Sequence, residues 1–150
     1  MIEAVQNAVL ARVAGLGLGL GGVAVPVLKG KAPKQENGES AATQITVHPA
    51  DRPKEVTRSD NGLDLHAYKV RVTTWSYGNR DNAAGSSDYS AWQDAIEQEF
   101  VRAGCRDELG LSEVFDTFAV QGVYLDRGSL AKGWDVQAVD VTVSIVRVRP

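Results

Sequence analysis

The residues best suited to nucleophilic or metal chemistry are few: one cysteine, Cys105, and two histidines, His48 and His66. A single cysteine excludes an internal disulfide and a cysteine-based zinc cluster. The histidines form no H-E-x-x-H pattern or close pair that would bind a metal. The chain also has no G-x-S-x-G nucleophile elbow and no Walker loop. These residue types predict no catalytic, metal-binding or cofactor-binding residues, and Cys105 is expected to fill space at a helix end.

A glycine run, Gly15–Gly22, contains the letters of a dinucleotide-binding fingerprint. Gly17, Gly19 and Gly22 match G-x-G-x-x-G. That fingerprint requires a strand before it and a helix after it. Here a helical pattern precedes the run and a strand-like segment follows it. We therefore interpret the run as a helix stop and a turn, because glycine disfavours a helix interior.

The segment Ser86–Gly104 has the clearest helical pattern in the chain. Its large apolar residues fall three or four apart, so a 3.6-residue period places them on one face. Ser87 or Ser90 is expected to cap its start, and Gly104 suits the position after its end. Residues 1–16 predict a second helix of the same kind. The two apolar faces comprise Tyr89, Trp92, Ile96, Phe100 and Ala103, and Ile2, Val5, Val9, Val13 and Leu16.

Alternating apolar residues predict the strands. Pro26 favours an edge position for the first strand, Pro49 is expected to end the second, and Asn61-Gly62 predicts a hairpin turn before the third. Asp51–Arg58 carries mixed charge and predicts no clear element. The expected strands are Val23–Val27, Thr43–His48, Leu65–Ser76, Val114–Leu125 and Trp134–Arg149.

Two of these strands have a face that can be assigned. Tyr68, Val70 and Val72 share one face of the third strand, and the odd-numbered residues from Val139 to Ile145 share one face of the last. Val146 and Val148 break that phase, which predicts a bulge or a strand end covered on both sides. The strand before this one, Val114–Leu125, is expected to bend at Gly122.

The predicted order of elements is α-β-β-β-α-β-β. Hairpin-joined strands whose helices do not alternate with them indicate an α+β domain. We expect a mostly antiparallel sheet of four to five strands with two helices packed on one face. The chain of 150 residues is expected to form a single domain, residues 1–150.

Composition narrows the class of protein. The net charge is −3, hydrophobic residues make up 43% and charged residues 23%. These values are typical of a soluble globular protein and not of a polybasic DNA-binding domain. No apolar run reaches the roughly 18–20 residues that span a membrane. Because the N-terminus lacks a basic start, we expect synthesis and folding in a cytoplasm.

Three stretches resemble the tail terminator, or tail-completion, proteins of long-tailed bacteriophages. They are the strand YKVRVTTWS (Tyr68–Ser76), the helix DYSAWQDAIEQEF (Asp88–Phe100) and the terminal strand DVQAVDVTVSIVRV (Asp135–Val148). Members of that family are small α+β proteins with an N-terminal helix, long strands, and one helix between two pairs of strands. The order of elements fits nearly the whole chain, while the glycine run and the long Lys29–Ala42 loop depart from compact members.

The resemblance implies a structural virion protein without enzymatic activity, assembled in the host cytoplasm and located in the tail–neck region. It implies a homohexameric ring that caps the tail tube and meets the head connector, with DNA passing through the lumen without base readout. A closed ring needs a heterologous interface. Exposed loops at either end of a rigid sheet are the expected contact regions. The candidate contact residues are Lys29, Lys31 and Lys34 in Lys29–Ala42, Tyr77, Asn79, Arg80 and Asp81 in Tyr77–Gly85, and Arg127 and Lys132 in Asp126–Gly133.

Other functions stay open at this point. The departures from compact members leave a neighbouring neck or head–tail adaptor protein as an alternative. A small nucleic-acid-binding module would use the Lys29–Lys34 loop and an exposed tryptophan, and it predicts salt-dependent DNA binding. An enzyme would use Cys105 or a histidine, and it requires a pocket around that residue.

Overall fold

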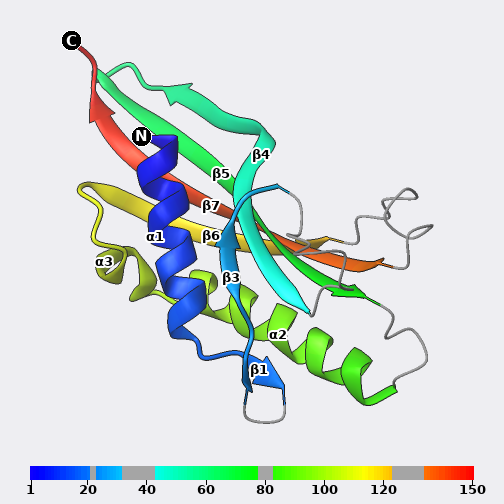
Figure 1. Ribbon diagram of the computed structural model, residues 1–150. Coiled ribbons are helices and arrows are strands. Elements are labelled where there is room, and N and C mark those ends of the chain that lie inside the picture. Colours follow the sequence, from blue (N-terminus) through cyan, green and yellow to red (C-terminus); the bar gives the residue numbers. More distant parts are fainter. Residues whose placement is uncertain (21–22, 32–42, 78–82, 123–133) are drawn as a thin grey trace.

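The computed structural model describes residues 1–20, 23–31, 43–77, 83–122 and 134–150. Helices and strands follow one another in nearly the predicted order (Figure 1). The elements are α1 (Ile2–Gly15), β1 (Gly19–Leu20), β2 (Val23–Ala24), β3 (Val27–Lys29), β4 (Gln44–Arg58), β5 (Leu63–Tyr77), α2 (Ala83–Val101), α3 (Cys105–Glu108), β6 (Val114–Gly122) and β7 (Trp134–Val148).

The main sheet has five strands in the order β3-β4-β5-β7-β6. Only the β3–β4 pairing is parallel; the other three are antiparallel. The two long helices lie on the same side of this sheet (Figure 1), α1 across β3 and β4 and α2 along β6 and β7. The predicted α+β class, with a mostly antiparallel sheet and two helices on one face, is confirmed.

The centre of the sheet is the pair β5–β7, which stays in register from Leu63 opposite Val148 to Tyr77 opposite Trp134. Its alternating apolar side chains point toward the helices, and Tyr68, Val70 and Val72 are buried there as predicted. The matching residues on β7 are Val139, Val141, Val143 and Ile145, all with no exposed surface.

The core lies between this face and the helices. Val5, Val9 and Val13 of α1 are fully buried, which confirms the predicted apolar stripe. Ile96 and Phe100 of α2 join the same cluster, and so does Cys105, which fills space as expected. Trp92 is 5% exposed. Since neither helix could be stable without burying this stripe, the sheet and the helices depend on one another.

The boundaries of the second helix differ from prediction. It begins at Ala83 and ends at Val101, so Ser87 and Ser90 lie within the helix and not at its start. Gly104 precedes the short helix α3 with a φ of −80° and is not a left-handed terminator. Ala103 lies beyond the last turn and is exposed, because the apolar stripe ends with Phe100.

β4 contradicts the prediction that Pro49 ends a strand. It continues for 15 residues to Arg58, through the charged segment to which no element was assigned. Its register with β5 shifts between Pro49 and Lys54. β3 covers only Ile45–Val47, so from Pro49 onward β4 is an edge strand. A proline is tolerated there because no neighbouring strand needs its missing N–H.

Other corrections concern strand ends. The predicted Val23–Val27 strand is two short strands, β2 and β3, with Pro26 between them, and β3 is the expected edge strand. The phase break at the end of β7 is not a bulge in β7; the register shift lies in its partner β6, between Val114 and Asp116. The end of β7 is not covered on both sides, since Val148 is 77% exposed.

The glycine run behaves as a helix stop followed by a turn. α1 ends at Gly15, and Gly17 adopts a φ of 65°, which suits glycine. The short strands β1 and β2 then pair with each other. No helix follows the run in residues 23–31, so the context of a dinucleotide-binding fingerprint is missing there.

A cluster of ion pairs joins the three helices. Glu99 of α2 accepts hydrogen bonds from Arg12 of α1 and from Arg102, the latter at 2.8 Å. Glu108 of α3 pairs with the same two arginines. Because the cluster connects all three helices, it fixes how they pack together on the sheet.

Candidate interaction surfaces

Only some of the predicted contact residues belong to the described part of the chain. Lys29 is the last residue of β3 and Tyr77 the last of β5, so both belong to strands and not to the predicted loops. Lys29 Nζ lies 3.0 Å from Glu3 Oε1, and Lys31 is exposed just after β3. The remaining candidates, Lys34, Asn79, Arg80, Asp81, Arg127 and Lys132, lie outside the described residues.

Four of the strand ends that flank the three predicted loops lie together. Gln44 at the start of β4 stands opposite Trp75, and Tyr77 at the end of β5 stands opposite Trp134 at the start of β7. Gly122, the last residue of β6, pairs with Ala138 of β7 at the same end. The starts of β4 and β7 and the ends of β5 and β6 therefore lie at one end of the sheet, whereas β3, which runs parallel to β4, ends farther along it with Lys29 opposite Val47.

The sheet face opposite the helices carries mostly polar side chains. Arg71 Nε donates to Asp140 Oδ1 at 2.8 Å across β5 and β7, and His48 stands opposite Arg71 on β4. Trp75 Nε1 donates to Thr46 Oγ1 at 2.7 Å. Trp75 is only 8% exposed and Trp92 belongs to the helix side, so neither presents a ring on which a nucleobase could stack.

The nucleophilic and titratable candidates do not converge. Burial raises the pKa of the Cys105 thiol, which lies in the core on the helix side. Burial, followed by the positive charge of Arg71, lowers the pKa of His48, which lies on the opposite face. The sheet therefore separates these two groups. His66 stands beside Tyr68, with 6.4 Å between the ring centres.

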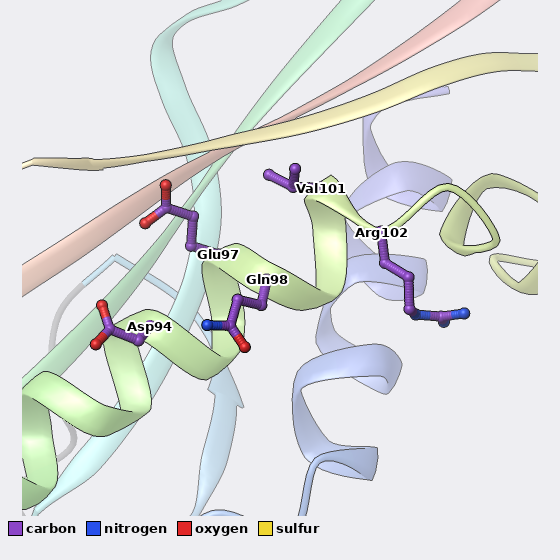
Figure 2. Close-up of a pocket in the computed structure, with 5 residues that line it drawn as sticks. All are labelled: Asp94, Glu97, Gln98, Val101 and Arg102. Atoms are coloured by element: carbon purple, nitrogen blue, oxygen red, sulfur yellow. The ribbon is translucent and has the colours of Figure 1, made fainter.

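Two hollows open on the described surface. One, of about 370 Å³, runs along α2 (Figure 2), where Glu97 and Val101 project on the side facing the sheet. The other, of about 240 Å³, is bordered by the β4–β5 turn, Phe115 and Val146. Neither is lined by Cys105, His48 or His66. Within the described ranges, no three histidine, cysteine or acidic residues stand close enough to hold a metal ion.

The two edges of the sheet are the surface features that sequence reasoning missed. At one edge, β6 exposes Phe115, Phe118 and Val120. At the other, beyond β3, the free part of β4 carries Lys54 and Arg58. The prolines could have signalled the β4 edge, but no pattern marks β6 as an edge, because strand order depends on long-range pairing.

Comparison with known protein families and curated proteins assigns the chain to no family. No protein-family model matches the chain, and no curated protein matches it significantly. Among the helices that the structure describes, none combines the length and apolar character needed to cross a membrane.

Proposed function

We propose that this protein is a structural virion protein of a long-tailed phage, a tail terminator-like ring subunit. It caps the end of the tail tube, stops tube polymerisation and offers a surface to the head connector. The ring is a homohexamer with DNA passing through its lumen. The subunit acts by binding and has no catalytic residues.

One observation carries the proposal: the three stretches that resemble the family form one structural unit. The first and third stretches belong to β5 and β7, which pair side by side along their whole length. The second stretch belongs to α2, whose buried residues Ile96 and Phe100 join the core on that pair. The resemblance therefore rests on one packed substructure and not on three unrelated segments.

Two further features support a binding role. Four of the strand ends that flank the predicted contact loops, those of β4, β5, β6 and β7, gather at one end of the sheet, which suits a surface that meets a partner. Both edges of the sheet are free of neighbouring strands in the described structure, so each subunit has two different sides to offer in a ring.

The test is a capping assay with purified tail tubes of the phage that encodes the chain. Tube protein is polymerised with and without the protein, and tube length is followed by light scattering and electron microscopy. We expect growth to stop and six-fold density to appear at one tube end. Unchanged tube growth together with no density at tube ends would refute the proposal.

The adaptor alternative makes a different prediction in the same preparation. A neck or head–tail adaptor would bind purified connector and leave tube growth unaffected. A terminator blocks growth at substoichiometric amounts, because each tube has one end of the relevant polarity. The two binding partners therefore separate the alternatives.

A further inference from the structure

We propose that the α2–β6 edge of one copy docks on the free β4 edge of a second copy, in a head-to-tail contact. This inference rests on the proposed function, because it supplies the interface between neighbours in the ring. The α2–β6 edge is defined here as Asp94, Glu97, Glu113 and the strand β6, and the β4 edge as Arg52–Arg58 with Lys31.

The β6 edge lacks the features that keep an edge strand unpaired. It runs for nine residues, contains no proline and no lysine, and has one charged residue, Asp116. Phe115, Phe118 and Val120 are 58%, 53% and 51% exposed. Long apolar edges of this kind associate with other strands unless a protein protects them. An edge in this condition is therefore expected to have a partner.

Carboxylates lie on the helix side of this strand and at its start, whereas the exposed Phe118 and Val120 share the open face of the sheet with Thr142 and Asp140 of β7. Gln121 Nε2 donates to Asp94 Oδ1 at 2.7 Å and to Glu97 Oε2, so one neutral amide serves two acids. Figure 2 shows Asp94 and Glu97 on successive turns of α2. Asp94, Glu97, Glu113 and Asp116 form no ion pair with any described residue. Arg106 Nη1 donates to the Phe115 carbonyl at 3.4 Å beside this strand, but it pairs with Asp107, so the edge keeps a net negative charge.

The β4 edge has the opposite character. Lys31, Arg52, Lys54 and Arg58 make no ion pair among the described residues. The unpaired acids are Glu55 within this edge and Asp51 just before it. Pro49, Pro53 and the register shift protect its first half. Lys54–Arg58 is therefore the part of this edge left free for a neighbour, and its net charge is positive.

Charge complementarity identifies the occupant as a second copy of this chain. The two edges lie on opposite sides of the five-stranded sheet, so one copy cannot bring its own edges together. A symmetric β6–β6 contact would place the same unpaired carboxylates against each other, which is repulsive. Acidic edge against basic edge is the favourable arrangement, and such a heterologous contact continues to the next copy until a ring closes.

The experiment uses two double variants of the full chain in sedimentation velocity at low salt, over a wide concentration range. Asp94→Lys with Glu113→Lys reverses the acidic edge, and Lys54→Glu with Arg58→Glu reverses the basic edge. Lys69→Glu with Arg147→Glu, on the central strands, is the matched control. Circular dichroism and thermal melting verify that each variant is folded.

We expect the wild type and the control to self-associate, and each edge variant to do so about tenfold more weakly, since several exposed charge pairs become repulsive. Mixing the two edge variants should then restore association, because contacts between unlike variants join the intact acidic edge to the intact basic edge and also join the two reversed edges, whose new charges are complementary. Alternating copies of the two variants can therefore continue through both edges, as copies of the wild type do.

A wild type that stays monomeric throughout would overturn the interface. So would edge variants that associate like the control, or a mixture that associates no more strongly than either variant alone. These results are separable from the capping assay. Edge variants that cap tubes as well as wild type leave the terminator function standing and reject this interface. Self-association through these edges without any tube capping supports this interface and rejects the terminator function.

Discussion

The ion-pair cluster between the helices allows a quantitative prediction for Glu99→Gln. This substitution keeps the shape of the side chain and removes the charge that Arg12 and Arg102 share. Glu99 is 12% exposed, while Arg12 and Arg102 are 30% and 42% exposed. The hydrogen bond from Arg102, with that from Arg12, lowers the pKa of Glu99 below its ordinary value.

The magnitude follows from this partial burial. A hydrogen bond to a charged group contributes about 1.5–3 kcal/mol when buried. Exposed ion pairs contribute about 0.2–1 kcal/mol. The cluster lies between these limits, and the amide of glutamine keeps part of the bonding. We expect Glu99→Gln to lower the free energy of unfolding by about 1–2 kcal/mol at pH 7.

The loss should depend on pH with a definite sign. Because the pKa of Glu99 is lower in the folded than in the unfolded protein, its stabilising effect is full above the unfolded value, about 4.3. The effect disappears as pH falls through the folded value. The difference between wild type and variant should therefore shrink toward zero in acid, as measured by urea unfolding from pH 7 to pH 3.

The matched control is Glu97→Gln, two residues earlier on the same helix. Glu97 accepts a hydrogen bond from Gln121 but has no ion pair among the described residues, so its substitution should change the free energy of unfolding by less than about 0.5 kcal/mol. If Glu99→Gln matches this control at pH 7, or if its loss is the same at pH 3, the cluster does not stabilise the helix packing as described.

Three further outcomes test the core. Phe100→Ala should reduce the free energy of unfolding by about 3–5 kcal/mol, because a fully buried ring leaves a cavity under both helices; a loss below about 1 kcal/mol in denaturant titration would contradict this packing. Thr117→Val should cost about 1–2 kcal/mol, since Thr117 Oγ1 donates to the buried Phe100 carbonyl at 2.6 Å, whereas Thr57→Val at an exposed position should be nearly neutral in the same titration. Cys105 should resist a thiol reagent at pH 7 in the native protein and react fully in denaturant, because burial hides the thiol and raises its pKa; rapid native labelling would show that the core opens there.

Local patterns predicted the elements whose buried faces follow a simple period. In α1, the buried residues recur at helical spacing: Val5, Val9 and Val13. In β5, they alternate as in a strand that buries one side: Tyr68, Val70 and Val72. The Asn61-Gly62 turn was equally readable, since Gly62 has a φ of 80° between paired strands. These features depend on neighbours along the chain and need no knowledge of the fold.

Features that depend on contacts between distant segments could not be predicted. From sequence alone, Pro49 predicts a strand end. The structure shows that β3 pairs only with residues before Pro49, so the proline lies on a free edge and β4 continues. Asp51–Arg58 predicts no clear element because its charges are mixed, yet Lys54–Arg58 pairs with β5 along one side. Arg12 and Glu99 give no signal in sequence that they meet.

The sequence by itself determined that this chain forms two amphipathic helices and several long strands, because apolar periodicity is a property of consecutive residues. Tertiary structure alone decided which strands lie at the edges, which face stays open, and where unpaired acids and bases gather. Those outcomes follow from pairing between segments far apart in the chain, where the free energy of burying a whole sheet face outweighs local preference.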